Sequence, residues 1–509
     1  MRSNIEKGQA QPRRNLFILI VLGVYLILSL LMFDPKLFTG GDNVVYVILS
    51  QSICSGKGYK DLYLPGEPPH TQYPFGFPLM LVPFVLMFGA NIVILKLVVL
   101  LTGLGALYFM VKICEKLFKD SLHFLIASYV SIPIMITYNH WILSEMPFVF
   151  LSLAAVYLLM NAEDNREIFN YLAFMCSIYA VFIRTAGIAL IIGIILWLLL
   201  KRRYKQLVIF LILFLLVFIP WQMRTAGVDR SGGYVEQLLA KNPYQMELGR
   251  INALGFLERI WENILYYAFK VLPSALLPVL HADILLIIVG AFFTILVTLG
   301  FITRIKRYAV FDVYFVFAVI VILAWPKVWS SDRFLMTILP ILVIYIYSGL
   351  FWITSKIKVK FIVEAFAGLI ICLNVVGMAP IVRSAMVHNT AYLRGDRRAG
   401  YSLDWRRYFE LIEWARRNTP AGSVIIARKP EFVYLLSGRK SFIYPFTTDH
   451  DRIREAIAGC DYIILDNFTW TVTTLYYLLP VLEDNPENYR IIKRTERPEF
   501  YLLKVVTDS

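Results

Sequence analysis

The chain has 509 residues, of which 58% are hydrophobic and only 17% are charged. This composition excludes an ordinary soluble enzyme and is typical of a polytopic membrane protein. The net charge of +14 does not indicate a nucleic-acid partner, because membrane topology explains where the basic residues lie.

Apolar segments long enough to cross a hydrocarbon core of roughly 30 Å recur along most of the chain. We predict about eleven transmembrane helices from them. The predicted spans cover residues 16–33, 92–113, 122–138, 147–159, 169–183, 187–200, 207–221, 284–302, 309–325, 334–353 and 361–380.

Basic residues cluster in nearly every second connection between these spans. The clusters lie at residues 13–14, 112–119, 201–205, 304–307 and 356–360. Counting spans from a cytoplasmic N-terminus places all of them in the cytoplasm, as the positive-inside rule requires. The sequence therefore predicts an integral membrane protein whose first loop, 34–91, and whose C-terminal segment lie outside the cytoplasm.

We predict two domains: a transmembrane domain, 1–383, which includes the first loop, and an extracytoplasmic α/β domain, 384–509. In the second, periodicity predicts helices at 404–418, 431–437, 449–459 and 473–482, and strands at 423–427, 441–444, 461–465, 489–494 and 500–505. The segment has no glycine-rich phosphate-binding motif and no metal-ligand spacing. We therefore interpret it as a folded cap that shapes the acceptor side, and not as a second catalytic centre.

The first loop carries the most informative short motif. Residues 40–43 read Gly-Gly-Asp-Asn, and residues 73–78 read Tyr-Pro-Phe-Gly-Phe-Pro. The segments 44–55 and 77–89 are apolar but too short to span, so we expect two helices near the membrane surface joined by a proline-rich elbow. Asp42 follows two glycines and is a candidate general base for an acceptor group. The alternative is that Asp42 only caps the helix that follows it.

A second carboxylate, Glu145, lies between the third and fourth predicted spans, on the same predicted side as Asp42. An ionisable group at a span boundary is either solvated there or part of a site. The two carboxylates could share a substrate or a divalent metal ion, with His70 or His140 as nitrogen ligands. A lone interfacial histidine is more often a hydrogen-bonded surface group.

Cationic residues also gather on the predicted outer side, which ordinarily carries few of them. They are Arg184, Arg224, Lys270, Lys327 and Arg333. A phosphate on a lipid carrier would suit such a set, because arginine offers a bidentate fork and lysine a point charge. The alternative for each residue alone is that its side chain reaches to lipid headgroups.

Taken in order, these motifs resemble the GT-C superfamily of glycosyltransferases, in particular the protein O-mannosyltransferases and the lipid A aminoarabinose transferases. The resemblance covers residues 16–380. It is carried by the acidic first loop, the elbow at 73–78, Ser-Glu-x-Pro-Phe at 144–148, Arg-Thr-Ala-Gly at 184–187 and the Asp-Arg-Phe segment that opens 332–340.

The resemblance implies an inverting hexosyl- or pentosyltransferase in the inner membrane of a bacterium or archaeon. The donor would be a polyprenyl-phosphate-linked sugar, and the acceptor an envelope lipid, glycan or protein. Asp42 matches the catalytic aspartate and Glu145 the second acidic position. The remaining candidates are Arg333, Lys327 and Arg184 for the donor phosphate, Tyr73, His70 and Asn43 for the substrate, and Asp42, Glu145 and His70 for a divalent metal ion.

The sequence departs from the family pattern at two places. Many relatives have glutamate where this chain has Asn43, and the aminoarabinose enzymes have lysine where it has Thr71-Gln72. A different class, a transporter or flippase of lipid-linked sugars, would also be polytopic and basic. Transporters place broken helices and charges near the membrane midplane, whereas here Lys96 is the nearest to a buried charge, and the glycines and prolines cluster at the outer ends of the predicted spans.

Overall fold

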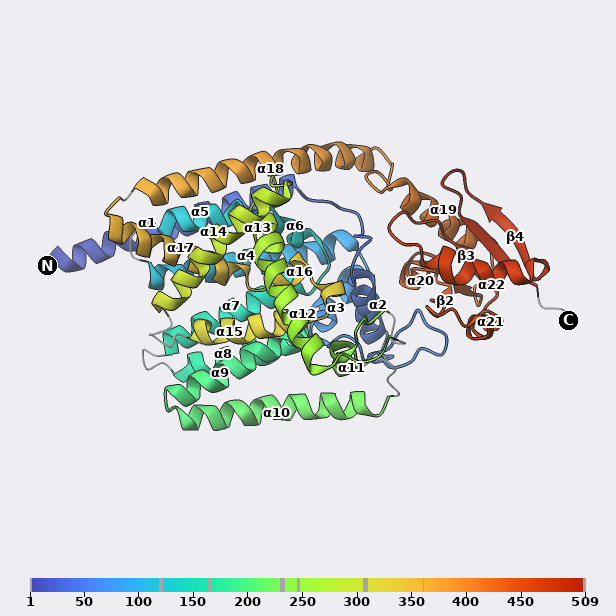
Figure 1. The fold of residues 1–509 in the computed structure, drawn as a ribbon, viewed down its shortest axis with the longest axis horizontal. Helices are drawn as coiled ribbons and strands as arrows, with labels where there is room; N and C mark the ends of the chain where they lie inside the picture. The colour runs from blue at the N-terminus through green and yellow to red at the C-terminus, as the bar shows by residue number, and fades with distance from the viewer. Residues whose placement is uncertain are drawn as a thin grey trace. The chain divides into compact units, whose positions relative to one another are not determined.

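The structure is a computed structural model of the chain (Figure 1). It describes residues 2–118, 122–162, 167–228, 234–244, 248–304, 310–359 and 361–506. The basic segments 112–119, 304–307 and 356–360, on which the predicted orientation depends, therefore lie partly outside the described residues.

The chain forms two compact units. The first, here called the helical unit, comprises Met1–Pro35, Thr71–Phe77 and Ile92–Val387. The second, the sheet unit, comprises Lys36–His70, Pro78–Asn91 and His388–Ser509. The first loop, which the predicted domain boundaries place with the transmembrane helices, is thus shared between the two units.

The helical unit is built from long apolar helices connected by short turns (Figure 1). Its helices are α1 (Arg2–Leu31), α4 (Ile92–Leu117), α5 (Leu122–Val130), α6 (Pro133–Thr137), α7 (Glu145–Ala162), α8 (Glu167–Ile183), α9 (Ile188–Leu200), α10 (Tyr204–Ala226), α11 (Tyr234–Leu239), α12 (Ala253–Tyr266), α13 (Leu272–Leu276), α14 (Asp283–Arg304), α15 (Val310–Ala324), α16 (Asp332–Met336), α17 (Leu339–Ile357) and α18 (Phe361–Leu393). A π-helical turn, Tyr267–Val271, joins α12 to α13.

Every predicted span coincides largely with helix in the structure, but fewer of these helices are long and apolar enough to be counted as membrane spans. Among the described residues, seven helices are long and apolar enough to cross a membrane, or eight if the bent pair Leu122–Val130 and Pro133–His140 is one span. The predicted spans at α8, α9 and α15 are shorter apolar helices. The count of eleven is therefore not confirmed. The last span is also longer than predicted, because Pro380 lies inside α18 and does not end it.

Close packing in the helical unit depends on glycine where α14 meets α17. A Cβ atom on Gly300 would lie 2.0 Å from the carbonyl oxygen of Tyr345, and one on Gly349 would lie 2.2 Å from that of Leu296. Both distances are far inside van der Waals contact. Small residues at these two positions therefore let the helix backbones touch, as in other membrane helix pairs.

The sheet unit combines the first loop with the C-terminal segment. The loop supplies α2 (Asn43–Cys54) and, from Pro78 onward, α3 (Gly76–Phe88). The C-terminal segment supplies β1 (Val424–Ile426), β2 (Lys440–Phe442), β3 (Tyr462–Leu465), β4 (Tyr489–Arg494), β5 (Tyr501–Val505), α19 (Leu403–Asn418), α20 (Pro430–Ser437), α21 (His450–Ala458) and α22 (Leu479–Asp484). Each predicted element of the C-terminal segment is confirmed within a few residues.

The strands form one sheet in the order β2-β1-β3-β5-β4. β2, β1 and β3 are parallel, with Val424 opposite Lys440 and Ile425 opposite Tyr462. β5 runs antiparallel to β3 and β4. A core on one face contains strand residues Ile426 and Ile463 together with side chains of α21 and α22. Alternate strand residues, which include the fully buried Ile425, point to the opposite face.

The first loop is fastened to the C-terminal segment inside the sheet unit. Helix α2 packs against α20. The Lys440 Nζ atom lies 2.6 Å from the Glu67 carboxylate, and the Tyr401 hydroxyl donates to the Leu37 carbonyl at 2.7 Å. The backbone N–H of Ser441, in β2, donates to the Tyr63 carbonyl at 2.7 Å. These bonds join positions that are more than 300 residues apart in sequence.

Candidate functional site

The helical unit holds one carboxylate between two arginines. Glu145 is the first residue of α7 and is completely buried. Its Oε1 atom lies 2.6 Å from Arg184 Nη1 and 2.5 Å from Arg333 Nε. The N-terminus of α7 also favours a negative charge at this position. The structure thus brings together three of the residues that the sequence predicted for the site.

Each arginine is held at the end of an element. Arg184 follows α8 in an extended conformation, before the 3₁₀ turn Thr185–Gly187. Its Nη1 atom also donates to Ser144 Oγ at 3.1 Å, and its guanidinium lies 5.7 Å from the centre of the Phe334 ring. Arg333 lies in the first turn of α16, where its backbone N–H donates to Asp332 at 2.9 Å. Both guanidiniums are therefore restricted in position before any ligand arrives.

The ion-paired group has polar atoms without partners. Its two guanidiniums face the Glu145 carboxylate, and the Asp332 carboxylate lies next to Arg333. Among the described residues, Glu145 Oε2 and Arg184 Nε are buried without a hydrogen-bond partner. Buried polar atoms without partners are rare and costly in proteins. Arg184 Nε is a donor and can bind an anionic oxygen of a ligand, whereas Glu145 Oε2 is an acceptor and can only receive a hydrogen bond.

The elbow at 71–77 packs beside the same end of α8. The Phe75 ring stacks on Phe182 with a centroid distance of 4.8 Å, and the Tyr179 hydroxyl donates to the Gly76 carbonyl at 2.7 Å. A Cβ atom on Gly76 would lie 2.5 Å from the Phe182 carbonyl oxygen, so only glycine fits. Half-buried Tyr73 belongs to this elbow. The elbow thus packs against Phe182, which lies two residues before Arg184 in the sequence.

Lys327 occupies a different environment. Its Nζ atom lies 3.0 Å from the Glu262 carboxylate of α12, and both side chains are more than half exposed. A surface pair of this kind contributes little to stability, about 0–1 kcal/mol. Within the described residues, Lys327 therefore pairs with Glu262 at the surface and not with the Glu145 group.

Asp42 lies in the sheet unit at the N-terminus of α2. In this fully described helix the Asp42 side chain makes no capping hydrogen bond. The capping alternative is therefore not supported. The turn before it depends on Gly41, whose φ of +65° is unfavourable for other residues.

Asn43 fixes the turn that presents Asp42. It is fully buried, and its amide nitrogen donates to the carbonyls of Phe38 and Gly40, both at 2.8 Å. These two hydrogen bonds tie Asn43, which follows the glycine pair 40–41, to Phe38 before the pair and to Gly40 within it. Asn43 therefore shapes the turn, whereas the sequence analysis expected it to bind substrate.

His70 is paired with a carboxylate that the sequence analysis overlooked. Its Nδ1 atom lies 2.8 Å from Asp61 Oδ1, and only 3% of His70 is exposed. Within the described ranges, no group of three or more His, Cys, Asp and Glu side chains could hold a metal ion. Glu145 is in addition a poor ligand for a cation, because two guanidiniums already face its bound oxygen.

The sequence analysis also missed the residue that supports the loop before Arg333. Asn263, fully buried in α12, donates to the carbonyls of Leu323 at 2.8 Å and Trp325 at 2.9 Å, and accepts from Ser330 Oγ at 3.1 Å. A signal was present in the sequence. Asn263 and Arg259 lie four residues apart on one face of a helix that exposes large apolar side chains, such as Trp261, on another face.

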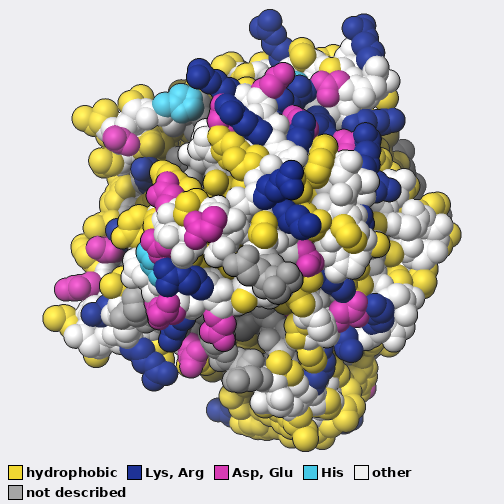
Figure 2. Space-filling view, turned by 90° about the vertical axis from the view of Figure 1, so that its right-hand side faces the viewer, with side chains coloured by type: hydrophobic (Ala, Val, Ile, Leu, Met, Phe, Trp, Pro, Cys, Tyr) yellow, Lys and Arg dark blue, Asp and Glu magenta, His cyan; other side chains and the backbone are white. Residues whose placement is uncertain are grey.

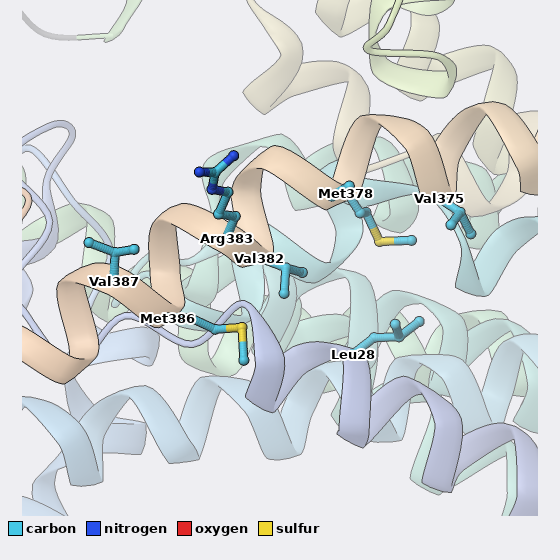
Figure 3. Close-up of a pocket in the computed structure, with 8 residues that line it drawn as sticks. Leu28, Val375, Met378, Val382, Arg383, Met386 and Val387 are labelled. Carbon is cyan, nitrogen blue, oxygen red and sulfur yellow. The ribbon is translucent and has the colours of Figure 1, made fainter.

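An apolar cavity of about 450 Å³ lies between α1 and α18 (Figure 3). Leu28 of α1 faces Met378, Val382 and Met386 of α18, while the Arg383 side chain projects away from them (Figure 3). Its lining offers no carboxylate. The cavity is therefore not a place for the chemistry expected of Asp42 or Glu145.

Comparisons with known proteins give a similarity of fold. No family model matches the chain, and no curated protein matches it by sequence. Two solved structures of ArnT from Cupriavidus metallidurans each cover 97% of this chain and are themselves covered to 99%. The apo structure is 12% identical, with a TM-score of 0.47, and the structure bound to undecaprenyl phosphate is 11% identical, with a TM-score of 0.50. The chain thus has a fold similar to that of ArnT, the aminoarabinose transferase of the GT-C superfamily that its motifs resemble.

Proposed function

We propose that the protein is an inverting glycosyltransferase that moves a sugar from a polyprenyl-phosphate carrier to an acceptor outside the cytoplasm. The observation that carries this proposal is the pair of arginines, Arg184 and Arg333, held on one oxygen of buried Glu145. The ArnT-like fold supports it, since one ArnT structure is bound to undecaprenyl phosphate.

In the proposed reaction the two guanidiniums bind the donor phosphate. Arginine suits this task because its planar fork matches phosphate oxygens and keeps its charge at any physiological pH. As the bond between the anomeric carbon and the phosphate oxygen breaks, the electron pair moves onto the phosphate. Positive charge that is already in place stabilises this change without further reorganisation.

Asp42 acts as the general base in this proposal. It takes the proton from the acceptor hydroxyl or amine while the acceptor atom bonds to the anomeric carbon on the face opposite the phosphate, so the configuration inverts. The phosphate leaves as an anion and needs no acid. No step requires a metal ion.

Glu145 has a positioning role in this proposal, although the resemblance marked it as a second catalytic acid. An oxygen engaged by two guanidiniums is a weak proton acceptor. What Glu145 supplies is orientation, because it holds the two arginines at one point and offsets their mutual repulsion.

The deciding experiment is Asp42→Asn. We expect sugar transfer to fall by roughly two to four orders of magnitude, with normal expression and normal donor binding. The assay measures product by mass spectrometry with purified protein and a polyprenyl-phosphate donor in detergent, where a transporter would give no product. Asp451→Asn, which removes an exposed carboxylate from α21, is the matched control. Near-normal transfer by Asp42→Asn would remove Asp42 from the role.

The sugar and the acceptor are found by a separate measurement. Mass spectrometry of envelope lipids, glycans and glycoproteins, with and without the gene, should reveal a sugar that is missing from one acceptor class. That difference selects the donor and acceptor for the assay above. Unchanged lipids, glycans and glycoproteins would contradict a transferase of this kind.

A further inference from the structure

The three parallel strands of the sheet unit end at one edge of the sheet. β1 lies between β2 and β3, and the chain leaves β1 toward β2 but leaves β3 toward the opposite side of the sheet, where β5 and β4 lie. The carboxyl ends of β1 and β3 therefore flank a topological switch point. In open α/β sheets, ligands bind in the crevice outside such a point.

The residues just after β1 and β3 are ones that recognise ligands. Arg428 follows β1, and its guanidinium lies 5.0 Å from the centres of both the Phe446 and the Trp470 rings. Its Nε atom donates to Thr473 Oγ1 at 2.9 Å. This bond and the two rings orient the guanidinium, and among the described residues its two terminal nitrogens have no hydrogen-bond partner.

The segment after β3 exposes an aromatic and apolar surface. Trp470 is 46% exposed, Val472 69% and Tyr476 62%. Lys429 adds a second cation, 5.7 Å from the Trp470 ring centre. Lys and Arg side chains also lie among hydrophobic ones over the upper part of the face of the molecule in Figure 2. An exposed aromatic ring beside cations is an arrangement that marks binding surfaces.

A buried network of hydrogen bonds lies next to the end of β3. Asp466, the first residue after β3, is only 8% exposed and accepts from Thr474 Oγ1 at 2.6 Å. The Thr474 hydroxyl also lies 2.6 Å from the Tyr444 hydroxyl. Burial raises the pKa of Asp466 to about 6. A carboxyl group that can lose its proton near neutral pH can accept hydrogen bonds from a ligand as well as from Thr474.

We propose that the carboxyl edge of β1 and β3 binds a saccharide that carries a phosphate or carboxylate group. Arg428 would bind the anionic group with its terminal nitrogens, since a guanidinium held flat and oriented is suited to bidentate contact. Trp470 would pack its exposed face against the apolar face of the sugar ring. The binding is a property of the sheet unit and does not depend on the transfer reaction proposed above.

The test is equilibrium binding to the full-length protein in detergent, without any lipid donor. The probes are glucose 6-phosphate, glucuronic acid, glucose and inorganic phosphate, followed by ligand-observed NMR. We expect glucose 6-phosphate or glucuronic acid to bind, with ring protons saturated from the protein. Arg428→Gln and Trp470→Ala should each weaken this binding by about tenfold or more.

Two matched controls separate recognition from general surface effects. Arg452→Gln removes an arginine from α21 whose side chain is 73% exposed, and Ile491→Ala removes an exposed apolar side chain from β4. Both should bind as the unchanged protein does. The proposal is overturned if no charged sugar binds, or if inorganic phosphate binds equally well and Trp470→Ala has no effect, which would mean an adventitious ion only. Failure of sugar transfer would leave the result of this binding test unaffected.

Discussion

The helical unit and the sheet unit each bury a carboxylate near an arginine, but they arrange the pair differently. In the helical unit, Glu145 bonds directly to Arg184 and Arg333. In the sheet unit, Asp466 accepts a hydrogen bond from the Thr474 hydroxyl and, within these described segments, forms no salt bridge with Arg428. The same residue types therefore give a closed ion-paired group in one unit and a titratable group beside an available guanidinium in the other.

The difference separates two uses of buried charge. A carboxylate that is shared between two guanidiniums holds them in place, and it destabilises the protein strongly when one partner is removed. A carboxylate that is buried without a guanidinium partner keeps its proton more tightly, as the raised pKa of Asp466 indicates. Stability should therefore change most on mutation of the Glu145 group in the helical unit, and on a change of pH at Asp466 in the sheet unit.

The largest effect is expected when the Glu145 group is broken. Glu145→Ala leaves two partly buried arginines without the carboxylate that they share, which should lower stability by about 3–5 kcal/mol and reduce transfer because the arginines lose their common anchor. Replacing Glu145, Arg184 and Arg333 together with methionine should restore most of the stability but not the activity. Thermal unfolding in detergent and the transfer assay measure both. An unchanged unfolding temperature for Glu145→Ala would show that the pairing contributes nothing.

A smaller effect is expected from the titration of Asp466. Its pKa is raised from 3.8 to about 6 in the folded state, so the folded state holds the proton more tightly than the unfolded state. The contribution of this group to the free energy of unfolding is therefore fully present below about pH 4. It is lost, by about 3 kcal/mol, as the pH rises to 6 and above. Asp466→Asn, which can still accept from Thr474, should remove this loss.

The measurement is hydrogen exchange of the β3 amides at pH 4.5 and pH 7, corrected for intrinsic rates. Other carboxylates titrate in this range, so the informative quantity is the difference between the unchanged protein and Asp466→Asn. If hydrogen exchange depends on pH equally in the two proteins, the loss of stability does not come from Asp466.

The smallest effect is expected at Lys327, whose ion pair with Glu262 is exposed. Lys327→Ala should change stability by less than about 1 kcal/mol and alter the KM for the donor by less than about threefold. Arg333→Ala, by contrast, should raise that KM by about tenfold or more. If the two variants affect donor KM equally, Lys327 belongs with the arginines as the sequence analysis expected.

The sequence predicted the elements well because hydropathy and periodicity are local. The bounds of β3 and α19 agree with the predicted ranges within a residue. The predicted span 361–380 ends too early, because α18 continues past Pro380 to Leu393, and membrane helices tolerate proline. The segment 224–283 carried no predicted element, although α12 lies there with its apolar side chains exposed.

The sequence predicted which residues belong to the site, but not what each of them does there. Motif order placed Glu145, Arg184 and Arg333 on one side, and the structure shows them in contact. Which oxygen each arginine binds depends on the ends of α7, α8 and α16, and spacing along the chain does not encode that geometry. For the same reason Asn43 was expected to face the substrate, although its amide closes the backbone turn.

The bonds that fasten the first loop to β2 and Tyr401 have a consequence for biosynthesis. Residues 36–70 leave the ribosome early, yet the strand order places β3 against β5, which ends at Val505. The sheet that supports the loop cannot close until nearly the whole chain has been translated. The sheet therefore becomes complete only at the end of synthesis, and a product truncated before β5 would lack the strand that joins β3 to β4.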